Sequence, residues 1–174
     1  MMYLYANRKY ARLIGVVLLS LVGCSQPTPP VVSTKPDHDA IAAIRSAGSQ
    51  SDSAVEVQPL RDPAVDGLVN QAHELEAQNK FDDAVAIARQ ALALANDAPD
   101  LLQLLSELEF ERRNYQDAAT LAQKSFELGP KIGSLCARNW QTMIEVRKIL
   151  KDDGGVEQAK RELNNCQASR PVRM

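Results

Sequence analysis

The sequence has few of the side chains that active sites usually require. It contains only two histidines, His38 and His73, and it lacks a glycine-rich phosphate loop, a metal-spaced histidine cluster and a Ser-x-x-Lys motif. Covalent chemistry needs a nucleophile, an acid and a base that lie together, and no such combination is visible. We therefore expect no enzyme, no cofactor and no metal site.

Long apolar runs and excess basic charge are also missing. The apolar stretch Leu13–Val22 has about ten residues, whereas a helix that spans a bilayer needs about twenty. The formal net charge is -2. Without residues 1–23, 17 basic residues would face 22 acidic ones. This mildly acidic balance argues against nucleic acid, whose phosphates require a basic surface.

The first 23 residues resemble a bacterial lipoprotein signal peptide. A basic segment precedes the apolar stretch, which ends in the sequence Leu21-Val22-Gly23-Cys24. This ending is similar to a lipobox, which implies cleavage after Gly23 and lipidation of the Cys24 thiol. The alternative is that Cys24 is an ordinary buried cysteine of a short core helix. Because Ser25 rather than aspartate follows, the resemblance implies anchoring at the periplasmic face of the outer membrane.

Residues 24–63 are rich in proline, serine, threonine and glutamine, a composition typical of disordered linkers. At about 3.3 Å per residue, such a linker could span at most roughly 125 Å. The segment 37–47 offers an alternative, a transient or partner-induced helix, because four apolar residues follow helical spacing: Ala40, Ile41, Ile44 and Ala47. We expect disorder here as in the rest of the linker.

From residue 64 the sequence repeats itself at an offset of 34 residues. Residues 68–75 align with residues 102–109, and the same offset pairs Phe81 with Tyr115, Ala84 with Ala118, and Ala88 with Ala122. This spacing resembles the tetratricopeptide repeat, in which each unit is a pair of antiparallel helices. The resemblance covers residues 64–130 and, more loosely, extends to 168. It implies an all-α stack of about three hairpins over residues 64–170; the alternative is a generic bundle of four to six helices.

Local features agree with hairpins of this kind. The small residues Ala72 and Ala84, like Ser106 and Ala118, are placed where two helices must approach closely. We expect Asn79 and Asn114 to adopt the left-handed conformation of the turns. A third hairpin is predicted at residues 133–150 and 156–168, with a break at residues 152–155. It departs from the repeat, since Trp140 takes the place of a small residue and Ala159 comes late.

Two further cysteines lie at opposite ends of the third hairpin. Antiparallel packing brings Cys136, near its start, close to Cys166, near its end. The periplasm is oxidising, so we expect a disulfide that closes a loop of about 30 residues and contributes about 3 to 4 kcal/mol. A redox or metal pair is the alternative, but it lacks a Cys-x-x-Cys motif and a nearby histidine.

In tetratricopeptide arrays the first helix of each hairpin lines a concave groove. Here that resemblance implies an acidic groove with an apolar floor, which suits a partner segment carrying lysine or arginine beside a hydrophobic anchor. The alternative is an ordinary solvated helix face, which we also expect for the run Glu107, Glu109 and Glu111. The predicted partner-binding residues are Val69, His73, Glu76, Gln103, Glu107, Phe110 and Trp140.

A lipid anchor, a proline-rich linker and a short repeat domain together resemble the LpoP-type outer-membrane lipoproteins, which activate class A penicillin-binding proteins. The resemblance implies a monomer that binds such a synthase in the periplasm and promotes peptidoglycan synthesis. The alternative is a scaffold or pilotin lipoprotein for a pilus, a secretin or another outer-membrane assembly. No functional residue is carried over from these families, because no diagnostic motif is shared.

Overall fold

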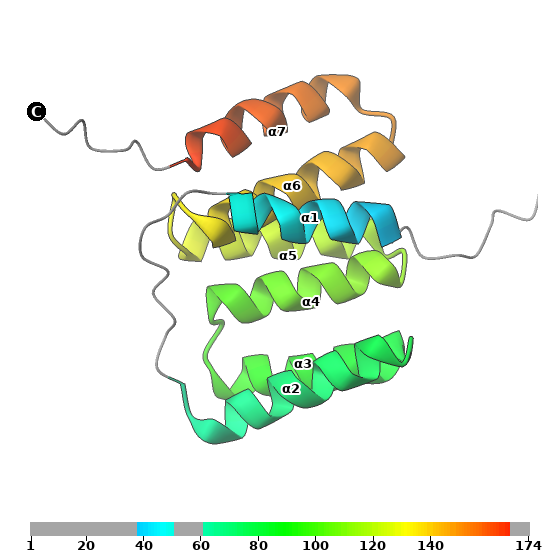
Figure 1. Cartoon of the computed structure of the whole chain (residues 1–174), viewed down its shortest axis with the longest axis vertical. Coiled ribbons are helices and arrows are strands. Elements are labelled where there is room, and N and C mark those ends of the chain that lie inside the picture. Colours follow the sequence, from blue (N-terminus) through cyan, green and yellow to red (C-terminus); the bar gives the residue numbers. More distant parts are fainter. Residues whose placement is uncertain (1–37, 51–60, 168–174) are drawn as a thin grey trace, which may run out of the picture. The chain divides into compact units, whose positions relative to one another are not determined.

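The computed structural model of the chain describes residues 38–50 and 61–167. Cys24 and the proposed signal peptide lie outside the described residues. The described part is all-helical and contains no strand (Figure 1). Its helices are α1 (His38–Gln50), α2 (Pro63–Ala77), α3 (Phe81–Leu94), α4 (Pro99–Glu111), α5 (Tyr115–Leu128), α6 (Ser134–Ile149) and α7 (Asp153–Asn165).

Helices α2 to α7 form three consecutive hairpins, α2 with α3, α4 with α5, and α6 with α7. Helix α3 also packs against α4, and α5 against α6, so the hairpins form a stack. The first residues of α3 and α5 are 34 positions apart, whereas those of α5 and α7 are 38 apart. The predicted stack of three helical hairpins, with an irregular third hairpin, is confirmed.

The two helices of each hairpin are joined by the same kind of turn. In each, the residue two positions after the helix is left-handed: Asn79 (φ 57°), Arg113 (φ 66°) and Lys151 (φ 58°). The assignment of a left-handed conformation to Asn114 is therefore wrong, since Asn114 has φ −82°. The backbone N–H of the next residue closes each turn, from Lys80 to Leu75 O, Asn114 to Glu109 O and Asp152 to Arg147 O, all at 2.9 Å. This bond satisfies a carbonyl that the helix end leaves without a partner.

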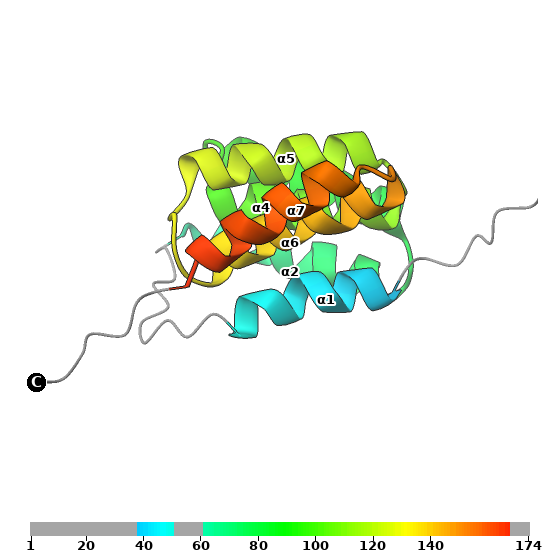
Figure 2. The same cartoon turned by 90° about the horizontal axis from the view of Figure 1, so that it is seen from above.

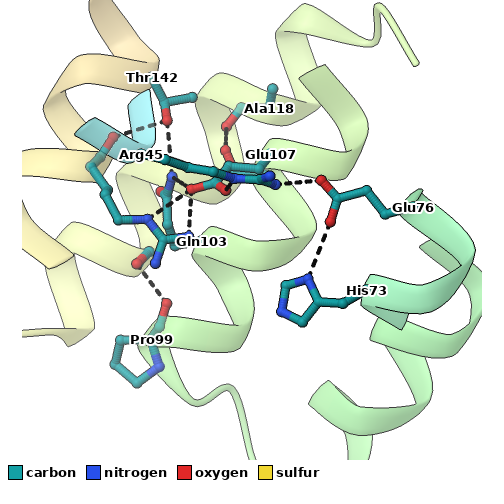
Figure 3. Close-up of polar contacts among 11 residues, drawn as sticks. Arg45, His73, Glu76, Pro99, Gln103, Glu107, Ala118 and Thr142 are labelled. Carbon is teal, nitrogen blue, oxygen red and sulfur yellow. Dashed lines mark hydrogen bonds and ion pairs between the residues drawn. The ribbon is translucent and has the colours of Figure 1, made fainter. Parts of the chain in front are cut away.

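Small residues allow the two helices of a hairpin to approach. Ala72 and Ala84 in the first hairpin, and Ser106 and Ala118 in the second, are fully buried, as their spacing predicts. The Ser106 hydroxyl donates to the Ala118 carbonyl at 2.7 Å and so joins α4 to α5 (Figure 3). In the third hairpin Ala159 is likewise fully buried.

Cys136 and Cys166 form the disulfide expected from the sequence, with their sulfur atoms 2.00 Å apart and their Cα atoms 5.5 Å apart. The bond joins the start of α6 to the end of α7. Beside it, the backbone N–H of Gly133 donates to the Cys166 carbonyl at 2.8 Å. The covalent link and this hydrogen bond together close the third hairpin, which is the last hairpin of the described residues.

Residues 38–50 contradict the expected linker. Instead of being disordered, they form α1, which packs along α6 and touches α4. Figure 2 shows α1 and α5 on opposite sides of α6. Ala40, Ile41 and Ile44 lie on one face of α1 and are buried by this contact. The expectation failed because a short segment has little apolar surface by itself, and its burial depends on a surface that only the folded hairpins provide. The folded domain therefore begins at residue 38 rather than 64.

Candidate functional site

The surface that α2, α4 and α6 present to α1 carries most of the predicted partner-binding residues. We call it the inner face. It combines an apolar part with a polar network that spans four helices (Figure 3). The residues that define it are Glu76 of α2, Gln103, Glu107, Phe110 and Glu111 of α4, and Arg138, Thr142 and Val146 of α6.

Glu107 is the centre of the network. Its carboxylate is completely buried, and it accepts hydrogen bonds from Arg45 Nε at 3.0 Å and from Arg138 Nη2 at 2.6 Å. Gln103 Nε2 donates to the same carboxylate at 2.9 Å and contacts Thr142 Oγ1 at 2.9 Å. A buried carboxylate is costly unless it is paired and hydrogen-bonded. Here two arginines and an amide satisfy it, and one of the arginines belongs to α1.

Arg45 connects α1 to two hairpins at once. Besides Glu107, its guanidinium donates to Glu76 Oε1 of α2, and Glu76 Oε2 lies 3.1 Å from His73 Nδ1. Burial pushes the pKa of the Glu76 carboxyl upward, but hydrogen bonds from His73 and Arg45 and the charge of Arg45 outweigh it and hold that pKa at about 2. Burial disfavours the charged form of Arg45 too, yet Glu76 and Glu107 raise its pKa.

Glu111 lies at the end of α4 beside this network, and among the described residues it forms no ion pair. Its side-chain Oε2 is buried and has no hydrogen-bond partner. Burial, reinforced by the nearby carboxylate of Glu76, raises the pKa of Glu111 to about 8. At neutral pH the inner face therefore has an ionised carboxylate, Glu76, and an acid, Glu111, that is mostly neutral.

The apolar part of the inner face adjoins this network. Phe110 is 2% exposed and packs with Ile41 and Ile44 of α1 and with Val146 of α6. The Tyr115 ring meets Phe110 edge to face, with the ring centroids 5.2 Å apart. Helix α1 thus supplies an arginine beside a pair of isoleucines, which is the partner chemistry that the sequence predicted for another protein.

The expectation of an open groove is consequently wrong. Gln103, Glu107 and Phe110 are buried beneath α1 and the neighbouring hairpins. Trp140 is also buried, at 8% exposure, and packs edge to face against Phe126 with the ring centroids 5.0 Å apart. Gln103, Glu107 and Phe110 are therefore not available to a partner while α1 stays in place, and Trp140 is buried in the core of the third hairpin.

The predicted residues of α2 have different surroundings. Val69 is half-buried and packs against the core that α2 shares with α3 and α4. The His73 side chain is 51% exposed, and that of Glu76 only 9%. Of the seven predicted residues, His73 alone has a largely exposed side chain, while Glu76 is reached through Arg45.

The acidic run of α4 does not form a solvated face. Glu107 and Glu109 are completely buried on different sides of the helix. Glu109 accepts hydrogen bonds from Arg89 at 2.8 Å, Arg112 at 2.9 Å and Asn114 at 2.7 Å. Two glutamates two positions apart on a helix point to different sides, so they cannot share one partner, and each has its own arginines. The sequence did not indicate that Arg45 of α1 is a partner of Glu107.

One cleft, of about 230 Å³, lies where α1 meets α6 and α7. The α1 side of this cleft is formed partly by small side chains, Ala43 and Ala47, and the opposite side includes Ala137, Gln141 and Leu163. Its lining has no ionisable group other than the disulfide-bonded Cys166. The contact between α1 and the third hairpin is therefore incompletely filled.

Comparison with known proteins gives no match: no family model fits the chain, and no curated protein or solved structure is significantly similar to it. Across residues 38–50 and 61–167 no group of histidine, cysteine and acidic side chains is arranged to hold a metal ion. Over the same residues no helix has both the length and the apolarity needed to cross a membrane. In the structure the inner face is covered by α1 of the same chain.

Proposed function

We propose that this protein is an outer-membrane lipoprotein, anchored through Cys24, whose helical domain is a binding module rather than an enzyme. Its most specific assignment is activator of a class A penicillin-binding protein in peptidoglycan synthesis. The observation that carries the proposal is the order of its parts: a lipobox, a proline-rich segment and a short stack of helical hairpins with an acidic, partly apolar inner face.

The proposal for the lipid anchor is tested at Cys24. Export of the native chain should give a mature protein whose first residue is Cys24 with acyl groups attached, because the thiol is the acceptor of the lipid. Mass spectrometry of the membrane fraction measures both properties. The Cys24→Ala variant should remain unprocessed, and an intact Met1 in the native membrane-bound protein would contradict the proposal.

Activation of a synthase is tested with residues 25–174, which lack the signal peptide and the lipid. An activator favours the competent state of its partner by binding that state more tightly. A coupling of about 1 to 3 kcal/mol corresponds to roughly 5- to 150-fold activation. The polymerisation and crosslinking rates of a purified class A penicillin-binding protein should rise by a factor in this range. A synthase that neither binds the chain nor changes its rate would exclude the assignment.

The position of α1 favours a second candidate. With α1 docked, residues 25–37 separate Cys24 from the domain, and at about 3.3 Å per residue the chain from Cys24 to His38 reaches at most about 45 Å. The reach of roughly 125 Å expected for a full linker is therefore available only without α1 docking. A short reach suits a scaffold or pilotin that works at the outer membrane itself. Crosslinking of the lipidated chain in cells distinguishes the two, because a scaffold captures outer-membrane subunits and an activator captures the synthase.

A further inference from the structure

We infer that α1 is a displaceable occupant of the inner face, and that the partner binds there by inserting an amphipathic helix with an arginine next to its buried aliphatic side chains. This inference rests on the proposed function, because it specifies how the proposed binding module meets its partner. It adds two points: the site is closed in the isolated chain, and the partner must compete with the chain's own helix.

Removal of α1 would change the chemistry of the inner face. Without α1, Glu76 and Glu107 would lose Arg45, and Phe110 would lose the covering Ile41 and Ile44. Among the described residues, Arg138 would then remain as the cation paired with Glu107. The uncovered surface would be acidic and apolar, which selects a helix that carries a cation beside a branched aliphatic residue.

Helix α1 belongs to none of the three hairpins. It has 13 residues, a length at which an isolated helix is marginal in water. It does not form a hairpin with α2, because residues 51–60 separate the two helices. It packs along α6, touches α4 and pairs through Arg45 with Glu76 of α2. Helix α1 thus buries one face, as the outer helices α2 and α7 do, whereas α4 is buried over residues 101–111.

Helix α1 leaves a cleft where it meets α6 and α7. The cleft of about 230 Å³ lies beside Ala43 and Ala47, whose side chains are too small to fill it. A partner helix in the same register with a larger aliphatic residue at the position of Ala47 would bury additional surface against Ala137 and Leu163. Such a helix would bind more tightly than α1 does, which a helix must do to displace a segment of the same chain.

Displacement of α1 would have a consequence for reach. When α1 is docked, at most about 45 Å of chain joins Cys24 to the domain, and when it is released the 38 residues from 25 to 62 can extend to roughly 125 Å. Binding of the partner would therefore lengthen the tether and open the inner face in one event.

The inference is tested first without any partner. A protease site replaces part of residues 51–60 in the chain 25–174, and the probe is a fluorescein-labelled peptide of residues 36–50. Before cleavage the probe should not bind at 10 micromolar or so, because the tethered α1 has an effective concentration of about 1 mM. After cleavage it should exchange into the inner face, as measured by fluorescence anisotropy. A probe with Ala47→Leu should bind at least about tenfold more tightly, since a tenfold change corresponds to the burial of only two methylene groups.

Two probes serve as a matched pair of controls. Ile44 is fully buried and Ala42 is exposed, so Ile44→Asp should abolish exchange while Ala42→Asp, which introduces the same charge and loses more helix propensity, should not. If the native probe fails to bind the cleaved protein, α1 is either a permanent part of the core or has no affinity of its own, and the inference is wrong. A dimer on gel filtration that exchanges α1 between copies would also overturn it, because the occupant would then be a second copy.

The second test uses the synthase and the uncleaved chain. Ile44→Asp should release α1 and tighten binding of the synthase at least about tenfold over the Ala42→Asp control, whereas Ala47→Leu should weaken it by filling the cleft in cis. Equal binding by these three variants would overturn the inference and leave the proposed activation intact. No binding by any of them, together with successful exchange of the probe, would exclude the synthase but retain the displaceable helix.

Discussion

Helices α2 and α4 are equivalent in the 34-residue repeat but differ in their surroundings. Helix α4 is buried over all of residues 101–111, whereas α2 buries only Val65 and Ala72. The difference comes from position: α4 lies between two hairpins and is also touched by α1, while α2 is at the end of the stack. The repeat therefore determines how each hairpin closes, and the neighbours determine what each helix must bury.

The two helices also differ in charge at equivalent positions. Glu107 and Glu111 of α4 correspond at the same offset to His73 and Ala77 of α2. The buried carboxylate of Glu107 requires Arg45 and Arg138, whereas the exposed His73 requires no cation. A charged side chain at the centre of the stack therefore depends on partners from elements that are distant in sequence.

The largest effect is expected at Glu107. Replacement by alanine leaves Arg45 and Arg138 without their shared carboxylate and opens a void, so Glu107→Ala should lower the free energy of unfolding by about 3 to 5 kcal/mol. The equivalent change in α2, His73→Ala, should cost less than about 1 kcal/mol, because His73 is exposed. Urea denaturation measures both. Equal losses would show that the position in the stack does not matter.

The disulfide should follow in magnitude. It joins residues 30 positions apart in the terminal hairpin, so Cys166→Ser should lower the free energy of unfolding by about 3 kcal/mol, mainly by releasing α7. Hydrogen exchange should show faster exchange in α6 and α7 and little change in α2 and α3. In the native exported protein, alkylation without reductant should label neither Cys136 nor Cys166. Uniformly faster exchange in all three hairpins would contradict this separation.

The pH dependence of stability should reveal Glu111. Its pKa is raised from 4.5 to about 8 in the folded chain, so the folded state holds the proton more tightly than the unfolded state. The resulting stability is fully present below pH 4.5 and is lost as pH rises through about 8. Glu111→Gln keeps this position neutral, and the fall in unfolding free energy between about pH 4.5 and 8 should become smaller. An unchanged slope would show that Glu111 does not carry this effect.

The turns should give the smallest effect. Lys151 is left-handed with φ 58°, a conformation that glycine adopts without strain, so Lys151→Gly should raise the free energy of unfolding by about 0.5 to 1 kcal/mol. Asn79 has the same conformation, but asparagine tolerates it, and Asn79→Gly should gain less. Thermal denaturation of the two variants checks the order. A loss of stability in Lys151→Gly would mean that its side chain contributes more than its backbone conformation costs.

The hairpins could be predicted because their signals are local. The pairing of Ala72 with Ala84 and of Ser106 with Ala118 follows from the 34-residue period, and the meeting of Cys136 and Cys166 follows from antiparallel packing. The inner face could not be predicted in the same way. The sequence identified several of its residues but predicted that they would be exposed. Periodicity shows which residues share a helix face and not what covers that face.

By itself the sequence determined the helices, the hairpin turns and the order of the stack, since these depend on interactions between residues close together in the chain. Only the tertiary structure decided that residues 38–50 fold, because their few aliphatic side chains gain nothing until Phe110 and Val146 provide a surface for them. It also decided the environment of Glu107, which is buried because Arg45 and Arg138 reach it from other helices. A carboxylate in an amphipathic pattern is read as exposed until the cations that compensate its burial are located in space.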